Sequence, residues 1–183
     1  MLTGARLLYV GRIDANKNIL PLLRGINSLG AHLACFTVVG DGPLWPEVQR
    51  LARSHPKIKV LGRLGNHEAR MMMREHDYLV LPSLYDGWGA VVNEALSVGT
   101  RVLCSEACGA SILLDGRTRG AMFSRRMAET TIREWTSHGE ISASDRMEIR
   151  AWAQTHISGT VAAEYFLRVM RGESCTAPWL TAL

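Results

Sequence analysis

Short apolar segments alternate along this chain with segments of helix length, and this alternation limits the fold more than any other feature of the sequence. The strand-like segments are rich in Leu, Val and Tyr and lie at 6–10, 33–39, 58–61, 78–82 and 101–105. Residues 120–123 form a shorter sixth. The segments are mostly apolar on both faces, as central strands of a parallel sheet are. The helix-sized segments between them lie at 17–29, 44–54, 67–75 and 90–98.

Repeated strand–helix units with right-handed crossovers predict an α/β fold with a doubly wound, Rossmann-like parallel sheet of about six strands. From about residue 124 the pattern becomes helical, with predicted helices at 126–137, 143–155 and 157–171. A length of 183 residues, with no internal repeat or linker, suits one domain. We expect this domain to span 1–172, followed by a tail at 173–183 without regular structure.

Several classes of protein fit the sequence poorly. No apolar run is long enough to cross a membrane, and the first residues lack the pattern of a secretory signal, so a cytoplasmic protein is expected. Cysteines at 35, 104, 108 and 175 match neither a zinc nor a redox spacing, and Cys35 and Cys104 are predicted to be buried thiols. The histidines have no metal-binding spacing either. We therefore predict no metal site and no cofactor.

The net charge of +4 comes from basic residues that are scattered along the chain. Without a dense basic stripe beside aromatic residues, nucleic-acid binding is disfavoured. A modest positive balance fits an anionic small molecule or an acidic membrane surface equally well.

The strongest functional signal follows the fourth strand-like segment, where Asp86-Gly87-Trp88-Gly89 leads directly into a helix at Ala90. Glycines let backbone N–H groups approach a ligand closely, and a helix N-terminus favours phosphate. The carboxylates of Asp86 and Glu94 flank this turn, and carboxylates are good acceptors for sugar hydroxyls. Phosphate and sugar hydroxyls together describe a nucleotide sugar. A glycoside hydrolase would also use two carboxylates, but it has no need of a phosphate site.

A second signal follows the first strand-like segment, where Gly11-Arg12 precedes Lys17 at the start of the next helix. Two cations there could hold a diphosphate. Taken alone, this spacing is better explained by a turn glycine with two solvated charges, because such spacing is common.

Together these motifs resemble the C-terminal domain of family 4 glycosyltransferases, which have the two-domain GT-B fold. The resemblance runs from Leu7 to about Arg171 and includes the Gly-Asp-Gly-Pro turn at 40–43 and the segment Val-Leu-Gly-Arg-Leu at 60–64. The sequence departs from the family at two positions: Asp86 stands where Glu is usual, and Trp88 where Phe is usual.

The resemblance implies a role for each matching position. Gly11, Arg12 and Lys17 match the segment that holds the donor diphosphate, and Glu94 the residue that binds the ribose hydroxyls. Asp86 matches the acidic residue near the transferred sugar. The remaining matches line the donor: Gly87, Trp88 and Gly89 beside the sugar, Ala90, Val91 and Val92 beneath the phosphates, and Arg63 and Leu64 beside the base.

The resemblance also implies an activity, which is metal-independent, retaining transfer of a sugar from an NDP-sugar to an acceptor, for example a bacterial glycan or lipid-linked glycan. The matching motifs all belong to the family's second domain, so we expect an N-terminal acceptor-binding domain to be missing. An excised piece, a truncated product and one subunit of a split enzyme are equally compatible with this. Without an acceptor domain the chain is expected to be inactive; the alternative is a nucleotide-binding module with no activity of its own. The full enzyme could contact the inner face of the membrane peripherally.

Overall fold

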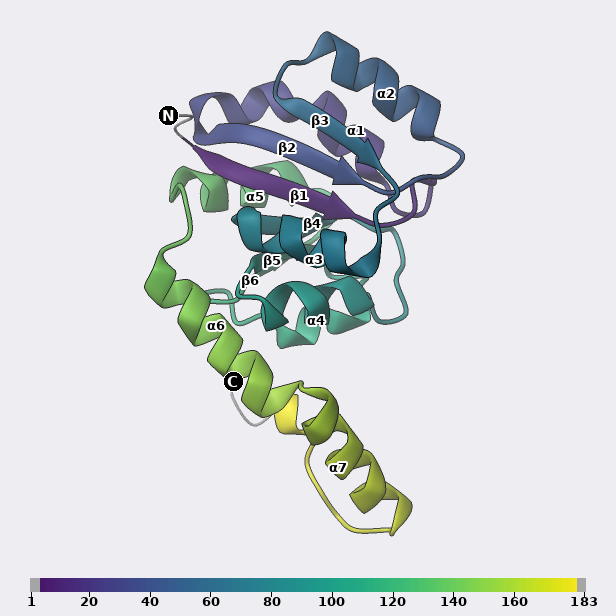
Figure 1. Cartoon of the computed structure of the whole chain (residues 1–183), viewed down its shortest axis with the longest axis vertical. Coiled ribbons are helices and arrows are strands. Elements are labelled where there is room, and N and C mark those ends of the chain that lie inside the picture. The colour runs from purple at the N-terminus through teal and green to yellow at the C-terminus, as the bar shows by residue number, and fades with distance from the viewer. Residues whose placement is uncertain (1–3, 181–183) are drawn as a thin grey trace.

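The structure, a computed structural model, describes residues 4–180. The expectations for the first residues and for the end of the tail lie partly outside this range. The described residues form one six-stranded, fully parallel sheet in the order β3-β2-β1-β4-β5-β6 (Figure 1). The strands are β1 Ala5–Val10, β2 Leu33–Val39, β3 Ile58–Gly62, β4 Tyr78–Leu81, β5 Arg101–Ser105 and β6 Gly120–Phe123. The predicted Rossmann-like fold is thus confirmed.

The order of the strands reverses between β1 and β4, which are neighbours in the sheet although two strands separate them in sequence. We call this contact the seam. β1 and β2 pair from Ala5 to Val10, whereas β1 and β4 pair at Leu7 with Tyr78 and at Leu8 with Leu79. Ligands of doubly wound sheets bind beyond the carboxyl ends of the strands at such a reversal.

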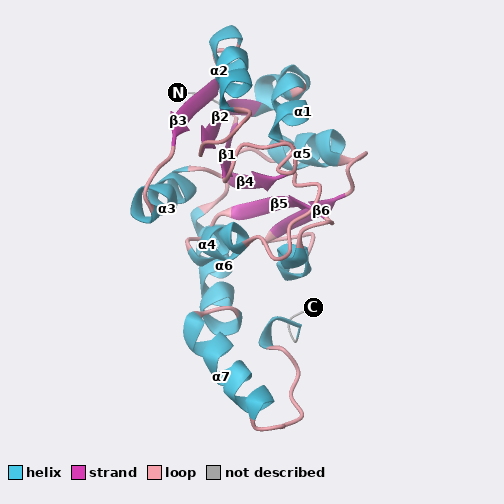
Figure 2. Ribbon diagram, turned by 90° about the vertical axis from the view of Figure 1, so that its right-hand side faces the viewer, coloured by secondary structure: helices cyan, strands magenta, loops and turns pink. Residues whose placement is uncertain are grey.

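Helices cover both faces of the sheet, as two views at right angles show (Figures 1 and 2). One face carries α1, α2 and α5, and the other carries α3, α4 and the start of α6. The bounds are α1 Ile19–Arg24, α2 Trp45–Ser54, α3 Asn66–Glu75, α4 Ala90–Ser97, α5 Ala128–Ser137, α6 Ala143–His156 and α7 Gly159–Met170. Among the described residues, no helix is both long and apolar enough to span a bilayer.

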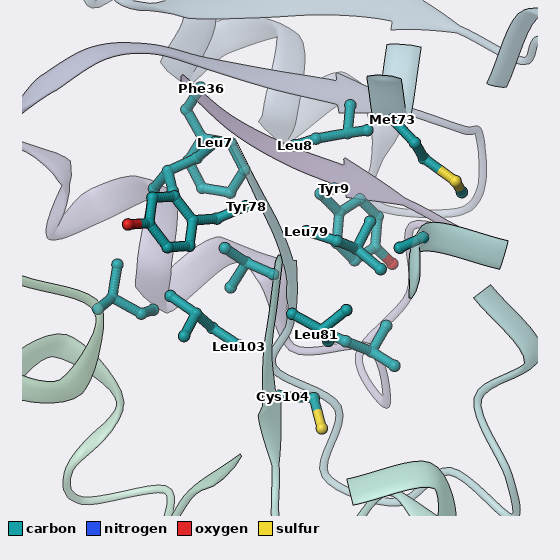
Figure 3. Close-up of a cluster of buried hydrophobic side chains, with 14 of the residues drawn as sticks. Leu7, Leu8, Tyr9, Phe36, Met73, Tyr78, Leu79, Leu81, Leu103 and Cys104 are labelled. Atoms are coloured by element: carbon teal, nitrogen blue, oxygen red, sulfur yellow. The ribbon is translucent and has the colours of Figure 1, made fainter. Parts of the chain in front are cut away.

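The core lies on both sides of the central strands, because their side chains alternate between two covered faces. Every residue of β2 and β4 is buried. Large side chains from β1, β4 and β5 pack together with Phe36 of β2 and Met73 of α3 (Figure 3).

The prediction of one helix over 17–29 was wrong. α1 ends at Arg24, and a 3₁₀ segment at Ile26–His32 follows Gly25. Gly30 inside that segment has φ 54°, a conformation that interrupts a right-handed helix. Apolar spacing alone did not reveal the break, because Ile26 and Leu29 are buried as helical residues would be.

The last helix projects away from the sheet, and none of its residues is fully buried (Figures 1 and 2). The tail returns toward the domain and forms a 3₁₀ turn at Pro178–Leu180, so the prediction of a tail without regular structure was wrong for these residues. Trp179 meets the ring of Tyr165 at 5.3 Å and the ring of Trp88 at 6.3 Å, both edge-on. This turn is held by contacts between aromatic rings that are distant in sequence. Apolar spacing in the sequence does not predict such contacts.

Candidate functional site

The loops that follow β1 and β4 meet at the carboxyl end of the seam. Lys17 Nζ lies 2.5 Å from Asp86 Oδ2, and the two side chains are 23% and 14% exposed. Two further bonds join the loops: Leu84 N donates to the Asn16 carbonyl at 2.7 Å, and Asn16 Nδ2 donates to the Tyr85 carbonyl at 2.8 Å. The structure therefore brings together Lys17 and Asp86, which belong to two separate motifs of the sequence.

Asp14 organises the loop after β1. Its carboxylate accepts the Lys17 N–H at 2.9 Å and lies 3.3 Å from Arg12 Nε. Tyr9 donates its hydroxyl to the Arg12 carbonyl at 2.6 Å, and burial, followed by the charges of Asp14 and Asp86, raises the pKa of that hydroxyl. The Arg12 side chain is 69% exposed, so its guanidinium is open to a ligand.

Close backbone contact fixes the neighbouring turn. A β-carbon on Gly40 would lie 1.8 Å from the Gly11 carbonyl oxygen, and one on Gly42 would lie 2.4 Å from the Ile13 carbonyl oxygen. Ile13 N donates to the Asp41 carbonyl at 2.7 Å. Gly40 and Gly42 thus let the loops after β1 and β2 pack directly on each other.

The glycine-rich turn before α4 rests on the loop that follows β5. Gly89 is the N-cap of α4 with φ 82°, and a β-carbon there would lie 2.5 Å from Cys108 Sγ. Asp86 N donates to the Ala107 carbonyl at 3.0 Å, and Cys108 Sγ donates to the Trp88 carbonyl at 3.1 Å. These contacts hold the turn so that α4 begins at the seam.

Cys108 is buried beneath the turn beside Cys104. A hydrogen bond from Cys104 lowers the pKa of the Cys108 thiol, and the same contact together with burial raises the pKa of Cys104. The prediction of a buried thiol is confirmed for Cys35 and Cys104. Cys108 was not predicted, because its position depends on the path of the loop after β5.

The remaining predicted residues lie along the same edge of the sheet. Glu94 is exposed in α4, and Trp88 is 39% exposed and donates its indole N–H to Asn93 Oδ1 at 2.9 Å. Arg63 is exposed and Leu64 half-buried after β3, at the end of the strand order β3-β2-β1-β4. Arg63 and Leu64 are therefore separated from Asp86 by the ends of β2 and β1.

Sequence reasoning missed Asp14, Asn16 and Cys108. An Asp placed three residues before Lys17 is a known pattern for capping a backbone N–H, so Asp14 carried a local signal. Asn16 and Cys108 act across loops that are distant in sequence.

Comparison with known proteins agrees with this geometry. Residues 4–135 match the family of glycosyl transferases group 1. The chain belongs to this family. Its fold is that of the C-terminal domain of GT-B glycosyltransferases, as solved structures confirm.

Individual glycosyltransferases match over different parts of the chain. The putative teichuronic acid biosynthesis glycosyltransferase TuaC of Bacillus subtilis is 36% identical over 58% of the chain and 26% of its own length. The glycogen synthase of Mycobacterium tuberculosis is 28% identical over 96% of the chain and 45% of its own length. Anabaena HepE, solved in complex with UDP, superposes with a TM-score of 0.71 at 18% identity, over 92% of the chain and 49% of HepE. HepE was also solved with UDP-glucose. The chain thus spans half or less of the length of these proteins.

Proposed function

We propose that the chain is the donor-binding half of a retaining glycosyltransferase that moves a sugar from an NDP-sugar to an acceptor held by a second, acceptor-binding lobe. The observation that carries the proposal is the contact between Lys17 and Asp86 beside the N-terminus of α4, at the reversal of strand order. A cation for diphosphate and a carboxylate for sugar hydroxyls meet there. Membership of a glycosyltransferase family supports the same conclusion.

The edge of the sheet has a length that suits an extended donor. Three strand spacings separate the end of β3 from the end of β4, which is roughly 14 Å. The base would lie beside Arg63 and Leu64, the ribose against Glu94, and the diphosphate between Arg12, Lys17 and the first N–H groups of α4. The transferred sugar would then lie over Gly87 and Asp86.

The chemistry follows from the charges at the seam. The bond between the anomeric carbon and the phosphate oxygen breaks, and its electron pair goes to the departing diphosphate. The acceptor oxygen bonds to the anomeric carbon on the same face, and its proton passes to the departing diphosphate. Lys17, Arg12 and the N-terminus of α4 stabilise the negative charge that builds up, and removing one such donor typically costs about 3 kcal/mol in barrier height. We propose that these groups act in place of a metal ion.

Two of the relatives point to a substrate class. HepE was solved with UDP and UDP-glucose, and TuaC is named for teichuronic acid biosynthesis. We therefore propose a uridine nucleotide sugar as donor and a bacterial glycan or lipid-linked glycan as acceptor.

Glu94 provides the first test. A carboxylate that accepts two ribose hydroxyls contributes about 1.5–3 kcal/mol, so Glu94→Ala should weaken UDP binding by roughly 10- to 100-fold. Calorimetry with inorganic pyrophosphate should show no loss, because pyrophosphate has no ribose. Glu164→Ala, at an exposed position of α7, is the matched control. Equal losses for UDP and pyrophosphate would remove Glu94 from the ribose site.

The cations provide the second test. Lys17→Ala and Arg12→Ala should weaken UDP and UDP-glucose binding by roughly tenfold or more, because each removes a charged hydrogen bond to phosphate. Uridine, which has no phosphate, should bind the variants and the parent alike. EDTA should leave UDP binding by the parent unchanged. A strict requirement for Mg²⁺ would contradict the proposed phosphate site.

A further inference from the structure

The chain after α7 turns back toward the domain (Figure 2). We call residues 173–180 the returning segment. Its start is fixed to α7, because Arg168 Nε lies 3.0 Å from Glu173 Oε2 and Glu173 N donates to the Arg168 carbonyl at 3.1 Å. Near its end Ala177 is buried, and its carbonyl accepts the N–H of Leu180 at 2.9 Å. The returning segment is therefore anchored at both ends.

The returning segment places an aromatic ring against the glycine-rich turn before α4. The ring centroid of Trp179 lies 6.3 Å from that of Trp88, and the ring planes are inclined by 68°. On its other side Trp179 meets Tyr165 of α7 at 5.3 Å and 70°. Such edge-on arrangements are favoured by the charge distribution of aromatic rings. Because Trp88 also donates its indole N–H to Asn93 Oδ1 at 2.9 Å, its ring is held at two places.

The backbone of the glycine-rich turn depends on contacts from outside it. Trp88 stands between Gly87 and Gly89, and glycines restrict a backbone less than other residues do. The Trp88 carbonyl accepts the N–H of Ala110 at 2.7 Å and the thiol of Cys108 at 3.1 Å. The backbone at Trp88 is thus held by the loop after β5, and its side chain by Asn93 and the returning segment.

These two supports contact each other. The 3₁₀ turn Pro178–Leu180 packs against the 3₁₀ segment Gly109–Leu113 that follows β5. Gly109 N donates to the Asp86 carbonyl at 3.0 Å, and a β-carbon on Gly109 would lie 2.3 Å from the Gly87 carbonyl oxygen. The returning segment, the 3₁₀ segment and the glycine-rich turn therefore form one packed unit, in which Trp179 contacts the only large side chain of residues 86–89.

We propose that Trp179 is a positioning residue of the donor site, an inference that rests on the proposed function. Trp179 fixes the ring of Trp88 and thereby the backbone of residues 86–89, over which the transferred sugar lies. The nucleotide is held by other elements. α4 itself is anchored by Val92 and Leu96, which are fully buried in the core, so its N-terminus stays in place beneath the diphosphate. Trp179 therefore contributes to binding of the sugar and not of UDP.

Calorimetry on the chain with UDP-glucose and UDP tests the proposal. Trp179→Ala should weaken UDP-glucose binding by about three- to tenfold, the range expected for one aromatic pair, and leave UDP binding unchanged. Trp179→Phe keeps a ring at this position and should restore most of the affinity. Leu180→Ala, at a 45% exposed position of the same turn, is the control and should change neither. Equal losses for the two ligands, or no loss for UDP-glucose, would overturn the proposal.

A double-mutant cycle shows whether Trp179 acts through Trp88. If it does, Trp179→Ala should cause no further loss of UDP-glucose affinity in a chain that already carries Trp88→Ala. Losses that add would mean that Trp179 acts on the sugar by another route, and the proposal would be wrong.

Hydrogen exchange without ligand gives a second readout. The amides of Gly109 and Ala110 bond to carbonyls of the glycine-rich turn, so Trp179→Ala should make them exchange at least threefold faster. The amides of β2, a fully buried strand, should keep their rates. Unchanged exchange at Gly109 and Ala110 would overturn the proposal. If the parent binds neither UDP nor UDP-glucose, the proposed function fails, and the exchange rates still decide whether Trp179 holds the turn.

Discussion

His76 is held in a neutral state by its surroundings. It is 6% exposed, its Nδ1 lies 2.6 Å from the Met72 carbonyl oxygen, and its Nε2 lies 2.8 Å from Thr37 Oγ1. The carbonyl is an acceptor, so Nδ1 carries the proton and Nε2 accepts from the threonine hydroxyl. Burial, which is the largest influence, lowers the pKa of the ring below its ordinary value of 6.5.

This histidine makes stability depend on pH. The unfolded chain takes up a proton near pH 6.5 and the folded chain resists doing so, so the free energy of unfolding should fall as pH decreases below that value. The slope approaches about 1.4 kcal/mol per pH unit for one group. His76→Gln should flatten this slope in urea unfolding between pH 7.5 and 5.5. His67→Gln, at an exposed position, should retain it, and the same slope in the His76 variant would contradict the assignment.

The contact between Lys17 and Asp86 is an example of a residue contact that can be predicted from the sequence. Both follow strands that are adjacent in a doubly wound sheet, so their meeting is a consequence of topology. The contacts that hold the glycine-rich turn before α4 could not be predicted in this way. Gly89 avoids a clash with Cys108 that only the folded path of the loop after β5 creates.

At the scale of elements, one buried carboxylate joins β1, β4 and α6. Asp77 is fully buried and accepts Arg6 Nε at 3.1 Å and Arg146 Nη2 at 3.2 Å. It also accepts the backbone N–H groups of Arg6 at 2.8 Å and Ile141 at 3.3 Å. The hydrogen bond that Arg6 donates to Asp77 raises the pKa of Arg6, whereas burial lowers the pKa of Arg146. The amino edge of the sheet is thereby tied to α6.

Removing the charge of Asp77 should loosen this junction. Asp77→Asn keeps the shape but leaves Arg146 without its buried partner, so we expect a loss of about 3 kcal/mol in the free energy of unfolding. Urea denaturation measures it. Glu140→Gln is the control: Glu140 is 59% exposed and lies 3.9 Å from Arg6, and surface pairs contribute little. A loss as small as that of the control would mean that packing, and not Asp77, holds α6.

Strands and helices could be predicted from the sequence where the burial of their side chains alone determines the apolar pattern. The strands were found because both of their faces are covered, which leaves an uninterrupted apolar run. The predicted range of the first helix was too long, because Gly25 and Gly30 interrupt helical structure without disturbing the apolar spacing.

At the scale of the whole molecule, α7 presents an apolar surface that the rest of residues 4–180 leaves exposed. Phe166 is 60% exposed, Leu167 52% and Met170 69%. Phe166 belongs to this surface, whereas Tyr165 packs against Trp179, and the ring of Trp152 lies 4.0 Å from the Arg119 guanidinium carbon. Such a patch is typical of a docking surface.

We predict that the chain alone binds a nucleotide sugar and transfers almost nothing, because transfer requires both reactants in near-attack geometry between two lobes. Adding a separately produced acceptor-binding lobe should restore acceptor-dependent transfer. Phe166→Ser/Met170→Ser should reduce that restoration at least tenfold without changing UDP binding, whereas Glu164→Gln should not. Efficient transfer by the lone chain would refute the two-lobe arrangement.

The seam has a mechanical consequence. β1 and β4 share the shortest ladder at the centre of the sheet, so a force that separates the two halves of the domain would open it there first. Lys17 belongs to one half and Asp86 to the other. A donor that contacts both would act as a cross-link between the halves, and the load that the domain withstands before rupture would rise with the occupancy of its own binding site.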